Sequence, residues 1–206
     1  MVAIIDYGVG NLFSLRSSFA AIGEEAVVTS DPEVIRKADR VILPGVGAFE
    51  DAAKKLRQTG LDTVVKEEAA KGKPLMGICL GMQMLFERSY EYGVHEGLGL
   101  LRGEIRPIAE RIPEGLKIPQ MGWNALKITR KSPLLKYTKE GDYVYFVHSY
   151  SAVKCDDSLL ASTEYGEDLT ACVGKGNVYG CQFHPEKSGE TGLRILKAFC
   201  ETEADT

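Results

Sequence analysis

The chain reads GICLGMQ over residues 77–83, and this stretch decides the fold that the sequence predicts. The apolar run at 74–76 indicates a short strand before it, and a helical pattern over 82–87 follows. A cysteine between two glycines at a strand-to-helix turn is the cysteine form of a nucleophile elbow. The glycines let neighbouring backbone pass close, and free N–H groups of the new helix favour a thiolate at Cys79. This stretch alone also fits a buried core cysteine beside two packing glycines.

A second stretch near the end of the chain reads GCQFHPE over residues 180–186. It predicts a strand that continues into extended backbone, because Pro185 disfavours both a regular ladder and a helix. In extended backbone, residues two apart face the same side, so Glu186 can reach the imidazole of His184 and hold its tautomer. Cys79, His184 and Glu186 would then form a nucleophilic triad. Taken alone, residues 184–186 fit a polar strand end equally well.

Strands and helices alternate in the first half of the chain. We expect strands at 2–6, 25–29, 41–43 and 74–76, and helices at 12–22, 49–56 and 61–71. This alternation predicts an α/β fold, with a mostly parallel central sheet flanked by helices on both faces. Ligand sites in such sheets lie beyond the carboxyl ends of the strands.

The pattern changes after about residue 97, where β-branched residues, glycine and proline become frequent. We expect strands at 98–108, 125–129, 143–150, 159–165, 170–173 and 177–183, and a closing helix at 188–200. The sequence therefore predicts an additional antiparallel β region in the C-terminal half. Because no linker or repeat interrupts the chain, we expect a single domain over residues 1–206, with a frayed tail at 201–206.

Composition excludes several classes of function. The 206 residues are 44% hydrophobic and 26% charged, as in an ordinary globular protein, and the net charge of −4 offers no basic stripe for nucleic acid. The five cysteines are scattered and include no CxxC pair, which argues against disulfides or zinc and favours the cytoplasm. We expect no membrane span and no metal. We also expect no cofactor, since the glycine pair at 8–10 lacks the third glycine of a dinucleotide site.

The two motifs together, GICLGMQ and QFHPE, resemble the class I (triad) glutamine amidotransferases, and the resemblance covers essentially the whole chain. Within that class, several further stretches are similar to the glutaminase subunits of imidazole glycerol phosphate synthases of histidine biosynthesis. These stretches are DYGVGNL (6–12), PGVGAF (44–49), PQMGWN (119–124), YFVHSY (145–150) and HPEKS (184–188). The resemblance implies a flavodoxin-like fold, L-glutamine as substrate, and hydrolysis through a γ-glutamyl thioester without a cofactor.

The resemblance also assigns roles to single residues. The backbone N–H groups of Val46 and Leu80 would form the oxyanion hole, and the glutamine would be held by Gly47, Gln83, Ser149 and Tyr150. The partner would be a (β/α)8-barrel cyclase subunit that converts PRFAR to imidazole glycerol phosphate and AICAR. The expected interface residues are Asn11, Gln120, Met121, Trp123 and Lys187. A glutaminase subunit of another synthase (the anthranilate type), a non-catalytic scaffold of the same fold and a cysteine peptidase are the alternatives.

Overall fold

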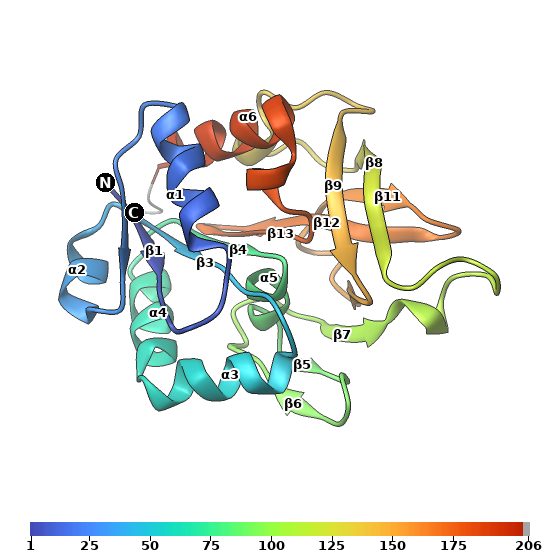
Figure 1. Cartoon of the computed structure of the whole chain (residues 1–206), viewed down its shortest axis with the longest axis horizontal. Coiled ribbons are helices and arrows are strands. Elements are labelled where there is room, and N and C mark those ends of the chain that lie inside the picture. The colour runs from blue at the N-terminus through green and yellow to red at the C-terminus, as the bar shows by residue number, and fades with distance from the viewer. Residues whose placement is uncertain (204–206) are drawn as a thin grey trace.

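The computed structural model describes residues 1–203, which form a nine-stranded sheet in the order β2-β1-β3-β4-β13-β12-β11-β8-β9 (Figure 1). The parallel strands are β2 (Ala26–Thr29), β1 (Val2–Ile5), β3 (Arg40–Leu43), β4 (Leu75–Ile78) and β13 (Val178–Cys181). The antiparallel strands are β12 (Asp168–Lys175), β11 (Leu159–Glu164), β8 (Gln120–Ile128) and β9 (Tyr143–His148). The predicted combination of a parallel half and an antiparallel half is confirmed.

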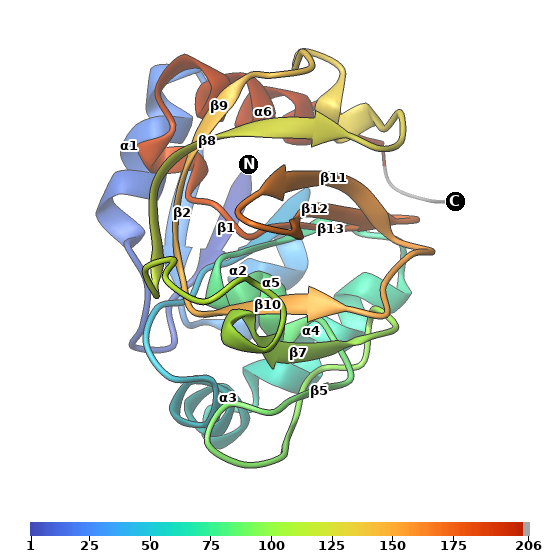
Figure 2. The same cartoon turned by 90° about the vertical axis from the view of Figure 1, so that its right-hand side faces the viewer.

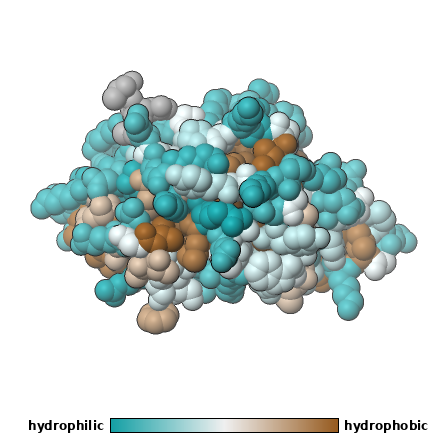
Figure 3. Space-filling model, turned by 90° about the horizontal axis from the view of Figure 1, so that it is seen from above, coloured by the Kyte–Doolittle hydropathy of each residue, from teal (hydrophilic) through white to brown (hydrophobic). Residues whose placement is uncertain are grey.

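Helices cover both faces of the parallel half. One face carries α1 (Leu12–Ala21) and α6 (Gly189–Cys200), and the other carries α2 (Pro32–Lys37), α3 (Phe49–Gln58), α4 (Leu61–Ala70) and α5 (Leu80–Met84). Successive side chains of β1 enter different cores, because side chains alternate between the two faces of a strand. Val2 and Ile4 belong to the same hydrophobic cluster as Phe19 of α1, whereas Ala3 and Ile5 belong to the cluster on the other face of the sheet. The outer side of α1 and α6 is mainly hydrophilic, with separate small apolar areas (Figure 3).

A second, smaller sheet lies on the side of α3 and α5 (Figure 2). Its strands are β10 (Tyr150–Val153), β7 (Glu104–Pro107), β5 (Arg88–Ser89) and β6 (His95–Glu96), in that order. The single strand expected over 143–150 is therefore wrong, because the chain passes at Ser149 from β9 of the large sheet to β10 of the small one. The strand expected over 98–108 is likewise reduced to β7, and α2 was not expected.

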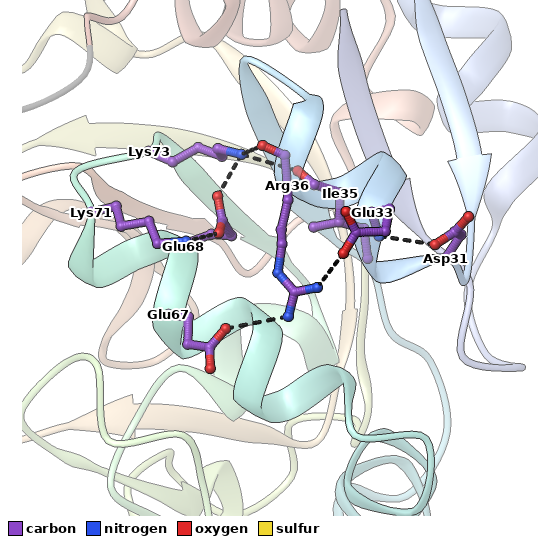
Figure 4. A network of polar contacts seen from close by, with 8 residues as sticks. All are labelled: Asp31, Glu33, Ile35, Arg36, Glu67, Glu68, Lys71 and Lys73. Carbon is purple, nitrogen blue, oxygen red and sulfur yellow. Dashed lines mark hydrogen bonds and ion pairs between the residues drawn. The ribbon is translucent and has the colours of Figure 1, made fainter.

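Buried charges fasten the helices that precede β4. The Glu68 carboxylate is almost fully buried on α4 and accepts hydrogen bonds from Lys71 and Lys73, each at 2.6 Å (Figure 4). Lys73 also donates to the carbonyl oxygens of Ile35 and Arg36 at the end of α2. Because Lys73 stands two residues before β4, this network fixes the entry of the strand that leads to Cys79.

The end of the described chain is held against the body of the protein. Arg40 donates a hydrogen bond of 2.9 Å to the carbonyl oxygen of Thr202, and Glu201 forms an ion pair with Lys136. The expected fraying therefore does not begin at residue 201, and residues 204–206 lie outside the described part of the chain. No helix within residues 1–203 has the length and apolar character needed to cross a membrane.

Candidate active site

The turn between β4 and α5 presents Cys79 at the carboxyl end of the parallel strands. Its φ of +54° is unusual for a residue other than glycine and marks a strained turn. The turn is tightly packed, since a Cβ on Gly81 would come within 1.9 Å of the Leu43 carbonyl oxygen, and one on Gly77 within 2.6 Å of the Gly81 oxygen. Both glycines are therefore required. The helix begins at Leu80 and ends at Met84, whereas the sequence pattern placed it over 82–87.

His184 and Glu186 follow β13, the strand next to β4, and are therefore brought close to Cys79 across the sheet. The Nδ1 atom of His184 lies 2.8 Å from Oε1 of Glu186, and both side chains are buried. The reach of Glu186 agrees with the sequence prediction, but the expected extended backbone is wrong. Extended backbone ends at His184, and Pro185 begins a 3-10 turn over Pro185–Lys187, where its fixed φ is compatible with the first position. The hydroxyl of Ser188 donates a 2.6 Å hydrogen bond to the His184 carbonyl and fixes this turn.

The charge state of His184 follows from opposing effects. Burial would lower the pKa of its imidazole, but hydrogen bonds and charge interactions with Cys79 and Glu186 outweigh burial and raise that pKa to about 9. At neutral pH the imidazole is therefore protonated. A protonated imidazole with a carboxylate behind it and a sulfur in front can donate a proton to a leaving group.

The loop after β3 carries the residues expected to bind an oxyanion. Tyr7 donates a 2.6 Å hydrogen bond to the Pro44 carbonyl, and burial followed by the nearby Cys79 charge raises the pKa of this phenol. The next carbonyl, that of Gly45, accepts a hydrogen bond of 3.3 Å from the Leu80 N–H. Gly45 has no room for a side chain, since a Cβ there would meet the Gly81 nitrogen at 2.8 Å. Val46 is exposed, and Gly47 has a φ of +92°.

These groups border one cavity of about 540 Å³. All but one of the residues predicted to act in catalysis, to bind the oxyanion or to bind glutamine line this cavity: Val46, Gly47, Cys79, Leu80, Gln83, Ser149, Tyr150 and His184. The exception is Glu186, which lies behind His184. The volume is of the size typical for a small-molecule site. The structure thus brings together residues from four separate stretches of sequence in one place.

The sequence reasoning missed one charged residue of this cavity, Glu91. Its carboxylate accepts a 2.7 Å hydrogen bond from the Phe49 N–H at the start of α3, a helix whose N-cap residue, Ala48, has no capping side chain. Burial raises the pKa of Glu91, while the Phe49 N–H and His95 act in the opposite direction. No local pattern could have identified Glu91, because the helix that it caps lies 42 residues away. It gives the cavity an acidic group.

A family model described as "Glutamine amidotransferase class-I" matches residues 3–202. This chain belongs to the class-I glutamine amidotransferase family. The chain is also similar to two proteins named "Imidazole glycerol phosphate synthase subunit HisH". The one from Lactococcus lactis is 53% identical, covering 97% of this chain and 98% of the relative. The one from Wolinella succinogenes is 52% identical, covering 98% and 99%.

The fold of this class-I glutamine amidotransferase also agrees with solved structures. A structure titled "Crystal structure of glutamine amidotransferase" superposes with a TM-score of 0.75 at 20% identity, over 97% of this chain and 100% of that one. The structure of PurLQS from Thermotoga maritima gives a TM-score of 0.74 at 22% identity, over 97% and 96%. At these identities the agreement concerns the fold.

The residues expected at an interface of this amidotransferase differ in exposure. Met121 and Trp123 are 63% and 52% exposed, Lys187 is exposed, and Asn11 is half-buried. The Trp123 ring packs edge-on against Tyr145, with 6.0 Å between ring centroids, and lies close to Gly189 at the start of α6. Gln120 differs from the others: it is fully buried, and its amide lies 2.7 Å from His148 Nε2, so it does not present its side chain to a partner.

Proposed function

We propose that this chain is the glutaminase subunit of an imidazole glycerol phosphate synthase, hydrolysing L-glutamine and supplying ammonia to a cyclase subunit. The observation that supports it best is the cavity lined by Cys79, His184 and Glu91, whose volume of about 540 Å³ has room for glutamine. The HisH relatives, about half identical over nearly their full length, favour this synthase over the anthranilate type. The free cysteines among the described residues support a reducing, cytoplasmic location.

In the first half of the reaction the Cys79 thiolate attacks the side-chain amide carbon of glutamine. The negative oxygen that forms needs two N–H donors, which we assign to Leu80 and Val46. His184 gives its Nε2 proton to the departing nitrogen, and ammonia leaves as the C–N bond breaks. The Glu186 carboxylate, 2.8 Å from His184 Nδ1, keeps the ring turned toward the sulfur throughout.

In the second half the γ-glutamyl thioester is hydrolysed. The neutral His184 takes a proton from a water molecule, the resulting hydroxide attacks the thioester carbon, and the Cys79 thiolate leaves. Glutamate is released, and the imidazole is again protonated. We assign Gly47, Gln83, Ser149 and Tyr150 to holding the substrate, with Glu91 opposite its ammonium group.

The ammonia requires a partner, because free ammonia is mostly protonated at neutral pH and ammonium is not a nucleophile. We propose a (β/α)8-barrel cyclase that converts PRFAR to imidazole glycerol phosphate and AICAR. It would dock over the strand-end loops that carry Asn11 and Lys187 and over the first residues of β8, Met121 and Trp123. The Gln120 side chain is buried and would not contact the cyclase directly.

Reconstitution with the cyclase tests the assignment. The complex should form imidazole glycerol phosphate from glutamine or from ammonium salts, and Cys79→Ala should abolish the glutamine-dependent rate while sparing the ammonia-dependent rate. Cys172→Ala, which removes a buried thiol elsewhere in the sheet, is the matched control and should keep both. Glutamate production by the Cys79→Ala complex at a substantial rate would refute Cys79 as the nucleophile.

A further inference from the structure

A chain of buried amides ends on the sulfur of Cys79. The Nε2 atom of Gln83 lies 3.2 Å from the carbonyl oxygen of Tyr150 and 3.1 Å from Oε1 of Gln182. The Nε2 atom of Gln182 lies 3.8 Å from Cys79 Sγ. Gln182 is fully buried and Gln83 is nearly so. Gln182 stands two residues before His184 but is not a member of the triad.

The direction of this chain is fixed by a backbone atom. A carbonyl oxygen only accepts hydrogen bonds, so Tyr150 requires the nitrogen of Gln83 to face it. The second N–H of the same Gln83 nitrogen then points at Gln182, so the side-chain oxygen of Gln182 must accept this hydrogen bond. The nitrogen of Gln182 is thereby turned toward the sulfur. Turning Gln182 over would place two NH₂ groups against each other and an oxygen against Cys79.

Several other polar groups surround the sulfur, and they prefer different charge states. The Val147 carbonyl, 4.0 Å from Sγ, can accept a hydrogen bond only from a neutral thiol. His184 favours the thiolate, with Glu186 behind it, while the nearby Tyr7 hydroxyl is already committed to the Pro44 carbonyl. The Gln182 N–H, held toward the sulfur by the buried Gln83 amide, favours the thiolate, because hydrogen bonds to charged groups are the stronger ones.

We propose that Gln182 is a catalytic residue that donates its side-chain N–H to the Cys79 thiolate, and that Gln83 and the Tyr150 carbonyl hold it in that orientation. This role rests on the proposed glutaminase function. It adds a second donor at the sulfur, so the thiolate is held by His184 and by a neutral group that stays in place when His184 gives up its proton. The thiolate that leaves during thioester hydrolysis is therefore still stabilised when the imidazole is neutral.

Alkylation of the full chain by iodoacetamide measures the thiolate directly. Gln182→Met keeps the side-chain length without a donor, and Gln182→Asn withdraws the amide from the sulfur by one methylene. Labelling of Cys79, followed by mass spectrometry, should be slower at pH 7 in both variants, while the rate at pH 9.5 changes little. The ratio of the two rates should fall by up to about tenfold, the limit set by loss of one hydrogen bond to a charged group.

Thr170→Val is the matched control. Thr170 lies on β12, beside β13, and donates a buried 2.9 Å hydrogen bond to the Ala152 carbonyl, so its loss costs stability without reaching the sulfur. This variant should keep the wild-type ratio, which separates a general loosening of the sheet from a loss of the donor. If Gln182→Met fails to fold, Gln182→Asn decides alone.

The outcomes distinguish this role from the proposed function. A wild-type ratio in the folded Gln182 variants overturns the donor role, even when the wild-type complex releases glutamate from glutamine. A wild-type complex that releases no glutamate overturns the glutaminase function itself. A lowered ratio in both the Gln182 and Thr170 variants also contradicts the proposal, because it assigns the effect to packing.

Discussion

The backbone N–H of Leu80 donates a hydrogen bond to the carbonyl oxygen of Gly45, with 3.3 Å between nitrogen and oxygen. The carbonyl and the N–H of one peptide plane point in opposite directions, so the Val46 N–H is turned away from Leu80. In this conformation the Leu80 N–H is already used and the Val46 N–H is not aimed at an oxyanion beside Cys79. Rotation of the Gly45–Val46 peptide changes ψ of Gly45 and φ of Val46; it would release the first donor and bring in the second, and Gly45 has no Cβ to restrict its ψ.

We predict that the isolated chain is a poor glutaminase and that the partner with its bound acceptor raises kcat by at least about 10²-fold, the usual value of one oxyanion donor. Val46→Pro lacks the N–H and should not be stimulated, whereas Val46→Ala keeps it and should be. Steady-state glutamate production, with and without partner and acceptor, measures both. A free subunit that already runs at the rate of the complex would show that this peptide is not the switch.

Trp123 is predicted to be an anchor of the partner interface. Because it is 52% exposed on an apolar strand end, Trp123→Ala should weaken binding of the cyclase by about 2 kcal/mol, or roughly 30-fold in Kd. Lys187→Ala should weaken it or reduce the stimulation of glutamate release. Tyr137→Ala is the control, since this exposed aromatic donates a hydrogen bond to Glu201 after the end of α6, whereas Trp123 lies near its start. Titration calorimetry showing unchanged affinity and coupling for Trp123→Ala and Lys187→Ala would refute this location.

His148 should make the protein sensitive to acid. Burial lowers the pKa of its imidazole from 6.5 to about 4, and the positive His184 acts in the same direction, although the Tyr150 carbonyl opposes it. Below pH 6.5 the unfolded chain binds a proton that the folded chain does not, so the free energy of unfolding falls as the pH is lowered toward 4. The loss from this group is at most about 3 kcal/mol. Urea titrations of wild type and His148→Gln should differ in slope between pH 4 and 6.5, and parallel pH curves would contradict the prediction.

Glu68 is predicted to matter more for stability than its neighbour Glu67. Glu68→Gln leaves the nearly buried ammonium of Lys73 without a counter-charge and should lower the free energy of unfolding by about 2–3 kcal/mol. Glu67→Gln removes an exposed pair with Arg36 at 3.4 Å and should cost less than about 1 kcal/mol. Chemical denaturation of both variants compares them. Equal losses would show that burial of Glu68 is not what gives its ion pairs their value.

The elbow and the alternation of strands and helices could be read from the sequence because both are local. Gly77 and Gly81 indicate that another stretch of backbone passes close to the turn, and the structure confirms that neither has room for a Cβ. The break at Ser149 could not be read, since the apolar pattern is continuous and only the small sheet's pairing with β7 separates the two strands. Glu91 escaped for a related reason: its hydrogen-bond partner, Phe49, comes from a distant helix.

The position of β13 has a consequence for protein synthesis. This strand, the last in the described chain, lies in the middle of the sheet between β4 and β12, and it leads directly to His184. A growing chain on the ribosome therefore has two partial sheets with open edges until residues 178–181 emerge. Cys79 is translated about a hundred residues earlier than His184 and lacks the triad imidazole during that time. The triad therefore cannot be assembled on the nascent chain before the final strand is inserted and brings His184 beside Cys79.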